Sequence, residues 1–139
     1  MQRVNKLKYL KIALYLFGII FIAGVPVMVM WAWPASWGWT PPHPEYEQMI
    51  VGVYMTLGVF LVLAAKDPLA ETSIIWFTVC SSIIHAGILL AQAMIDGSES
   101  AYLLADIPAL LMVAFVLWYL MPDNNELQLK TTKRPYHLP

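Results

Sequence analysis

Residues 72–95 read TSIIWFTVCSSIIHAGILLAQAMI, an apolar stretch that contains no Asp, Glu, Lys or Arg. As an α-helix this stretch would reach about 36 Å, at about 1.5 Å per residue. Because the hydrocarbon core of a bilayer is about 30 Å thick, the stretch predicts a transmembrane helix. Its polar side chains, above all His85, then need an explanation, since a polar group surrounded by lipid requires a partner.

Apolar segments on both sides of this stretch predict further helices of the same kind. We expect four spans, at about 9–33, 46–65, 72–95 and 101–121. The second span ends at Lys66-Asp67-Pro68, because proline cannot continue the helical hydrogen-bond ladder. The first span follows basic residues as a signal peptide does, but its apolar run is longer than a typical signal core, so we expect a retained helix. The sequence therefore predicts one transmembrane domain over 9–121, flanked by the polar segments 1–8 and 122–139.

The composition supports an all-α integral membrane protein built as a four-helix bundle. Hydrophobic residues make up 60% of the 139 residues and charged residues 12%, and the mean hydropathy is +0.64. A soluble domain carries about a quarter charged residues. The net charge of −1 gives no basic field for nucleic acid, so no nucleic-acid partner is expected. The single cysteine, Cys80, excludes an internal disulfide.

The basic residues predict the orientation of the four spans. Lys and Arg gather in cytoplasmic loops, whereas acidic residues contribute little to this rule. The loops 34–45 and 96–100 contain neither Lys nor Arg. The N-terminal segment, the second turn and the C-terminal tail hold all eight basic residues: Arg3, Lys6, Lys8, Lys11, Lys66, Lys130, Lys133 and Arg134. An even number of spans places these three segments on one side, so both termini are expected in the cytoplasm.

Five polar residues of the spans are expected to line one polar cavity in the outer half of the bundle. Helical spacing places Glu47 and Tyr54 on one face of the second span, and His85 and Gln92 on one face of the third. Asp106 descends from the outer end of the fourth span toward the same level. Because a lone charge in lipid is costly, these groups are expected to turn inward and pair. The candidate site residues are Glu47, Tyr54, His85, Gln92 and Asp106.

Structural roles for these residues stay open. His85 can bridge to a neighbouring carbonyl group, and Glu47 can be a charge at a helix start, where the helix dipole favours acids. Ser81 and Ser82 commonly bond the backbone of their own helix. We expect no metal and no cofactor, because no paired ligand motif is present and because only one histidine lies within a span.

Small residues and prolines indicate how the helices pack. Gly52 with Thr56, and Gly87 with Ala91, are each four residues apart, a spacing that lets helices approach closely, either within the bundle or between subunits. Pro26, in the first span, leaves the carbonyl of Ile22 without its helical donor, and Pro108, in the fourth span, does the same to the carbonyl of Leu104. Kinks are therefore expected at both prolines.

Several motifs together carry a resemblance to a known group of proteins. They are Glu47-Gln48-Met49-Ile50, Gly52-x-Tyr54, Leu57-Gly58-Val59-Phe60, Lys66-Asp67-Pro68, Ser82-x-x-His85-Ala86 and Asp106-x-Pro108-Ala109-Leu110. The region over about 8–121 resembles a family of small four-helix bacterial membrane proteins of unknown function, and its layout is loosely similar to the DoxX-like proteins. The resemblance implies a four-helix bundle in a bacterial inner membrane. It implies no activity.

Three functions fit these observations. The first is a non-catalytic protein, either an accessory subunit of a membrane complex or a binder of a small apolar molecule, and the absence of a catalytic motif favours it. The second is an enzyme that acts on a lipid or a quinone-like molecule by acid-base chemistry. The third is a proton-coupled transporter, for which four spans would require a homo-oligomer. In each case the lipid bilayer is the first partner.

Overall fold

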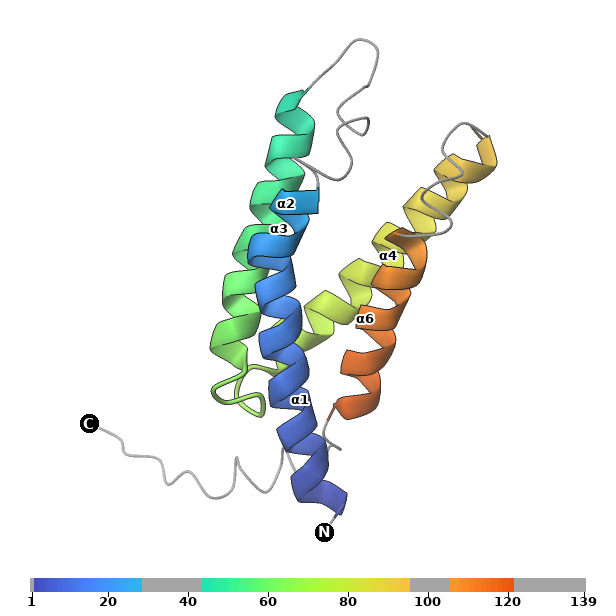
Figure 1. The fold of residues 1–139 in the computed structure, drawn as a ribbon. Coiled ribbons are helices and arrows are strands. Elements are labelled where there is room, and N and C mark those ends of the chain that lie inside the picture. The colour runs from blue at the N-terminus through green and yellow to red at the C-terminus, as the bar shows by residue number, and fades with distance from the viewer. Residues whose placement is uncertain (1, 29–43, 96–105, 122–139) are drawn as a thin grey trace, which may run out of the picture.

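The computed structural model describes residues 2–28, 44–95 and 106–121, and every regular element within these ranges is helical (Figure 1). The first helix is continuous and consists of α1 (Gln2–Ile19), the π-helical η1 (Ile20–Gly24) and the short α2 (Val25–Val27). It is followed by α3 (Pro44–Ala64), α4 (Thr72–Ile95) and α6 (Asp106–Leu120). Within the described ranges, the prediction of an all-α chain with four helices is confirmed.

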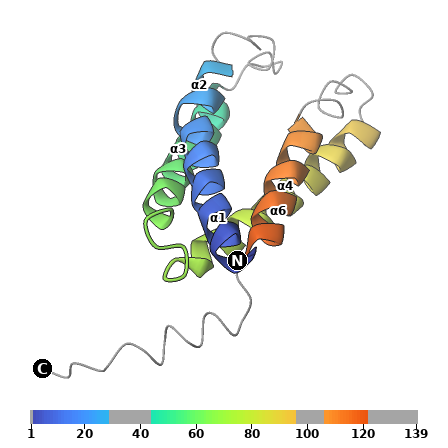
Figure 2. The same cartoon turned by 60° about the horizontal axis from the view of Figure 1, so that its bottom comes forward.

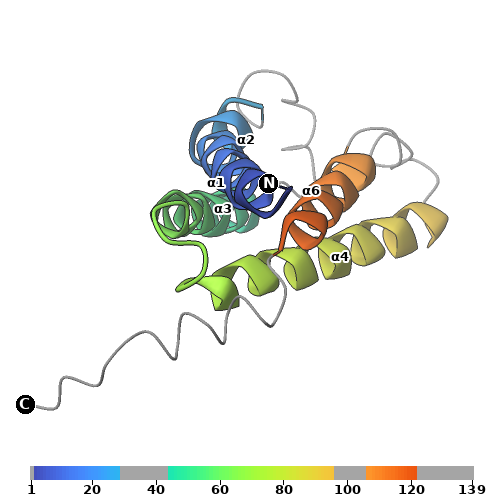
Figure 3. The same cartoon turned by 90° about the horizontal axis from the view of Figure 1, so that it is seen from below.

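The helices form two pairs that meet at one end of the molecule. In one pair α1 and η1 pack against α3, and in the other α4 packs against α6 (Figure 1). The pairs lie together where α1 begins and α6 ends, and they diverge toward the opposite end (Figures 1 and 2). Seen from below, α1 stands between α3 and α6, and it contacts both of them (Figure 3).

The main hydrophobic core lies at the end where the two pairs meet. Each of the four helices contributes a fully buried side chain there. These side chains are Leu10 and Leu14 from α1, Leu61 from α3, Ile75 from α4 and Leu117 from α6. A smaller cluster, formed by Ala86, Ile107 and Leu110, joins α4 to α6 farther along. Among the described residues, the main core therefore holds the two pairs together where they meet, and the second cluster holds the α4–α6 pair beyond it.

Two glycines bring α1 and α3 into close backbone contact. A Cβ atom on Gly58 would lie 2.7 Å from the carbonyl oxygen of Gly18, and one on Gly18 would lie 2.9 Å from the carbonyl oxygen of Gly58. No larger residue fits at either position without separating the helices. Gly52 and Gly87, which the sequence marked as close-approach positions, make no such contact among the described residues, because a Cβ on either would meet nothing within 4 Å there. Their role between subunits stays a prediction.

The first helix accommodates Pro26 by a change of helix type. Pro26 has no N–H group, and its ring would clash with the carbonyl four residues earlier in a regular α-helix. The turn directly before it, η1, is wider, and the N–H group of Val25 donates to the carbonyl of Ile20. A single π-helical turn is a known way to absorb such a defect. The irregularity expected at Pro26 is therefore a π-helical segment.

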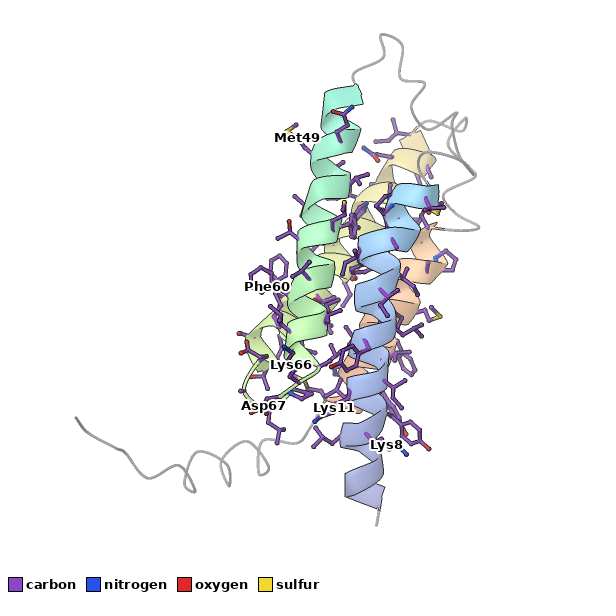
Figure 4. All side chains as sticks on the ribbon, turned by 60° about the vertical axis from the view of Figure 1, so that its left-hand side comes forward. Lys8, Lys11, Met49, Phe60, Lys66 and Asp67 are labelled. Atoms are coloured by element: carbon purple, nitrogen blue, oxygen red, sulfur yellow. The ribbon has the colours of Figure 1, made fainter. Side chains whose placement is uncertain are left out.

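Two helices are long and apolar enough to cross a membrane, judged by length and composition. They cover Lys6–Val27 and Thr72–Ile95. In addition, α3 and α6 contain shorter apolar segments, Gln48–Ala64 and Asp106–Leu120. Large hydrophobic side chains cover the outside of these helices, and Met49 and Phe60 on α3 are 58% and 51% exposed (Figure 4).

The basic side chains of the described residues gather at the end where the pairs meet. Lys8 and Lys11 on α1 lie near Lys66 in the turn after α3, at the opposite end of α3 from Met49 (Figure 4). The ammonium group of Lys11 donates to the carbonyl of Lys66 at 3.2 Å. This bond ties α1 to the end of α3, where the last carbonyl groups of a helix lack partners.

Candidate functional site

A hydrogen bond between two side chains links the two helix pairs. The phenol oxygen of Tyr54, on α3, lies 2.5 Å from Nδ1 of His85, on α4. The two ring centroids are 5.8 Å apart. Both side chains are partly buried. Since these helices belong to different pairs, the bond is a polar contact across the interface between the pairs.

The π-helical segment positions a third ring at this site. Phe21, in η1, is only 5% exposed, and its ring meets Tyr54 at a centroid distance of 5.2 Å and an interplanar angle of 75°. Such edge-to-face contacts are favourable arrangements of aromatic rings. The π-helical turn before Pro26 therefore contains the residue through which the first helix contacts Tyr54.

Asp106 adds a carboxyl group from the fourth helix. It is the first described residue of α6 and is partly buried. Ile107, the next residue, shares a buried cluster with Ala86, which follows His85 on α4, so the carboxyl group lies near the hydrogen bond between His85 and Tyr54. In the part of the chain that the structure describes, Asp106 forms neither a hydrogen bond nor an ion pair with them. The carboxyl group thus lies where α6 packs against α4, close to the Tyr54–His85 pair but not bonded to it.

The face of α4 that leads to His85 is polar and well packed. Thr78 is fully buried and its hydroxyl donates to the carbonyl of Ile74 at 2.8 Å, while the hydroxyl of Ser81 donates to the carbonyl of Thr78 at 3.2 Å. Ser82, one turn before His85, is 5% exposed. The hydroxyls of Thr78 and Ser81 are satisfied by their own helix, which is the structural role open from the sequence.

The structure brings together three of the five candidate residues, namely Tyr54, His85 and Asp106. We call this group, with Phe21, the Tyr54–His85 site. Gln92 lies two turns beyond His85 and is exposed. Glu47 stands in the first turn of α3, and its side chain lies outside the described residues. The common cavity for all five residues therefore stays a prediction, as does any role of the site in binding.

Sequence reasoning did not find Phe21. It stands in an uninterrupted apolar run, and no local pattern separates it from its neighbours. Pro26 predicts an irregular segment in this part of the helix. It does not predict that the segment directs the ring of Phe21 toward Tyr54.

The arrangement has a defined hydrogen-bonding capacity. The neutral imidazole of His85 carries one proton, on Nδ1 or on Nε2. If Tyr54 donates to Nδ1, Nε2 carries the proton and is a donor; in the other tautomer Nε2 is an acceptor and the phenol is free to donate. The pair can therefore present either a donor or an acceptor to a bound molecule. Among the described residues, no three His, Cys, Asp or Glu side chains are placed to share a metal ion.

Comparison with known proteins gives one match. The sequence model described as "Family of unknown function (DUF6632)" matches residues 4–133, nearly the whole chain. Its description states no activity, and nothing in the match links the chain to DoxX-like proteins or to bacteria. Neither the comparison with curated proteins nor the comparison with solved structures found a match.

Proposed function

The chain belongs to this family of unknown function, and we propose that it is a four-span integral membrane protein that binds a small, largely apolar molecule. In this proposal both termini lie in the cytoplasm and the membrane is a bacterial inner membrane. The Tyr54–His85 site holds the polar group of the bound molecule, and the apolar body of that molecule lies among the helices.

The distribution of apolar surface supports insertion into a membrane. Only 33% of the apolar window in Lys6–Val27 and 28% of that in Thr72–Ile95 is buried inside the protein. A core helix of a soluble protein is mostly buried, whereas a helix in a small membrane bundle turns much of its apolar surface to lipid. The same holds for the shorter segments, since Phe60 on α3 and Phe115 on α6 are 51% and 60% exposed.

The position of the basic residues supports the orientation. The start of α1, the turn after α3 and the end of α6 all lie at the end of the molecule where Lys8, Lys11 and Lys66 are found (Figures 1 and 4). The remaining basic residues follow α6 in the sequence, at 130, 133 and 134. The rule that basic loops stay in the cytoplasm therefore favours a cytoplasmic location for this end.

The hydrogen bond between Tyr54 and His85 carries the binding proposal. A polar group that enters the hydrocarbon region without a partner costs several kcal/mol, so polar groups there usually have a function. Tyr54 satisfies one nitrogen of His85. The second nitrogen has no partner among the described residues, and it is the group that we expect to meet the bound molecule.

The same pair also supports a second candidate function. General acid-base catalysis needs two titratable groups within reach of one substrate, and a tyrosine bonded to a histidine near a carboxyl group meets this need. An enzyme acting on a lipid or quinone-like molecule is therefore the runner-up. A transporter or an accessory subunit of a larger complex would use the same fold, and either would add a homo-oligomer or a partner subunit.

A photoactivatable probe tests the binding proposal. A long-chain alcohol with a diazirine near its hydroxyl is added to the full chain in phosphatidylcholine nanodiscs, and the labelled peptides are mapped by mass spectrometry. We expect labels around Tyr54 and His85 in excess of those on the lipid-facing side of α1. Tyr54→Phe should lower this excess, and Tyr9→Phe is the matched control because Tyr9 is 57% exposed on α1.

The result that would reject the binding role is uniform labelling. If all apolar surfaces are labelled alike, and Tyr54→Phe changes the pattern no more than Tyr9→Phe does, the site does not select a bound molecule. The Tyr54–His85 bond would then be a structural link between the helix pairs.

A further inference from the structure

We propose that the Tyr54–His85 site prefers a molecule whose polar group is a cation, such as a long-chain amine, over one with a neutral or anionic group. This inference rests on the binding function proposed above and adds the sign of the charge that the site selects. It is carried by the position of Asp106 at the start of α6, where the next residue, Ile107, shares a buried cluster with Ala86, the neighbour of His85 on α4.

No Lys or Arg of the described helices lies near Asp106 to neutralise its carboxylate. Between Gln48 and Ala64, α3 has no Asp, Glu, Lys or Arg, and α4 has none from Thr72 to Ile95. In α6, Asp106 is the one such residue. The lysines Lys6, Lys8, Lys11 and Lys66 belong to the opposite end of α1 and α3 from the site. Among the described residues, the ionisable side chains near Asp106 are therefore His85 and Tyr54, and neither carries a fixed positive charge.

His85 does not neutralise Asp106 by direct contact. Its Nδ1 is engaged by Tyr54, and within the described residues no ion pair joins its ring to the carboxylate. A carboxylate in the hydrocarbon region needs a proton or a cation as its partner. Ile107, next to Asp106, shares a buried cluster with Ala86, next to His85, so a group bound at the second nitrogen of His85 lies near the carboxyl group of Asp106. A bound cation would be attracted there, and a bound anion would be repelled.

The aromatic rings strengthen the preference for a cation. Phe21 meets Tyr54 edge to face, and Tyr54 lies beside the His85 ring. The electron-rich faces of aromatic rings attract organic cations, more strongly where water is excluded. A carboxylate next to aromatic rings therefore combines two features that recognise an amine, and neither feature favours an anionic group.

The test uses three diazirine probes with the same alkyl chain and different ends: a primary amine, an alcohol and a carboxylic acid. Each is added at pH 7 to the full chain in nanodiscs of zwitterionic phosphatidylcholine, which avoids a charged lipid surface. The readout is labelling around Tyr54 and His85 divided by labelling of the lipid-facing residues of α1 in the same sample. This ratio removes differences in how the probes enter the bilayer.

We expect the amine to give a ratio about tenfold higher than the alcohol, the effect of a charge-assisted contact of about 1.4 kcal/mol. The acid should give the lowest ratio. Asp106→Asn should reduce the amine ratio to that of the alcohol, while Asp106→Glu should keep the preference. Glu71→Gln, which removes an exposed carboxylate before α4, is the control and should change nothing.

Equal ratios for amine and alcohol in the unaltered chain would overturn the preference for a cation and leave the binding function standing. So would an amine preference that survives Asp106→Asn. If no probe labels the site above the α1 surface, the binding function itself fails. Retained alcohol labelling in Asp106→Asn shows that this variant is folded, so loss of the amine preference is not a result of unfolding.

Discussion

Replacing Gly58 by alanine is expected to push α1 and α3 apart. The added Cβ would lie 2.7 Å from the carbonyl oxygen of Gly18, 2.8 Å from Cγ1 of Ile22 and 3.0 Å from the backbone nitrogen of Ile22. Carbon atoms in ordinary contact are about 3.5–4.0 Å apart, so the two helices must separate by roughly 1 Å. Two of the three obstacles are backbone atoms, which cannot turn away as a flexible side chain can. Overpacking of this kind costs about 1–3 kcal/mol.

A second substitution on the same helix isolates this packing cost. Alanine is favoured over glycine inside a helix by roughly 0.5–1 kcal/mol, and this gain applies at both Gly58 and Gly52. A Cβ on Gly52 would meet nothing within 4 Å. The difference in the free energy of unfolding between Gly58→Ala and Gly52→Ala therefore contains the packing cost alone. We expect Gly58→Ala to be less stable than Gly52→Ala by about 1–3 kcal/mol.

Reversible unfolding in mixed micelles, followed by far-UV circular dichroism as the denaturing detergent is increased, measures both variants. Gly18→Ala should behave as Gly58→Ala does, because its Cβ would lie 2.7 Å from Cγ2 of Val62 and 2.9 Å from the Gly58 carbonyl oxygen. If the free energies of unfolding of Gly58→Ala and Gly52→Ala agree within about 0.5 kcal/mol, the result would contradict the close approach of α1 and α3.

Two further substitutions probe the core and the site. Leu61→Ala removes a fully buried side chain and should lower the free energy of unfolding by about 2–5 kcal/mol in the same assay. Leu63→Ala, at a position that is 46% exposed, should lower it much less. Equal losses of stability would contradict the burial of Leu61 in the core. Tyr54→Phe removes the bond to His85 and should destabilise the fold by about 1 kcal/mol, and Tyr9→Phe, on an exposed side chain, should be within about 0.5 kcal/mol of the unaltered chain. A Tyr54→Phe variant as stable as Tyr9→Phe would show that the bond contributes little.

The apolar runs predict the helices well and their ends less well. The run at 72–95 coincides with α4, because a polar turn limits it on one side and the Lys66-Asp67-Pro68 turn on the other. In contrast, α1 begins at Gln2, earlier than the expected start at about residue 9. Hydropathy marks where a helix meets lipid, and a polar segment with good helix formers continues the helix beyond that point.

The sequence predicts a contact between two helices only where the spacing of polar residues within one helix shows which face turns inward. The polar face of α4 indicated that His85 turns inward, and Tyr54 meets it there. Gln92 shares the spacing of that face but is exposed, since the two helix pairs diverge toward this end of α4 (Figure 1). The Gly18–Gly58 contact depends on the register between α1 and α3, which the sequence of neither helix encodes alone.

Cysteine accessibility tests most directly the claim that the chain is a four-span membrane protein with both ends in the cytoplasm. In a background with Cys80→Ala, single cysteines are placed at Ser36, Ser98 and Thr131 and exposed to a membrane-impermeant maleimide in intact cells, and then after the cells are opened. We predict that the cysteines at 36 and 98 react in intact cells and that the one at 131 reacts only after opening. Labelling of position 131 in intact cells, or protection of 36 or 98, would contradict the proposed topology and with it the location of the Tyr54–His85 site inside the membrane.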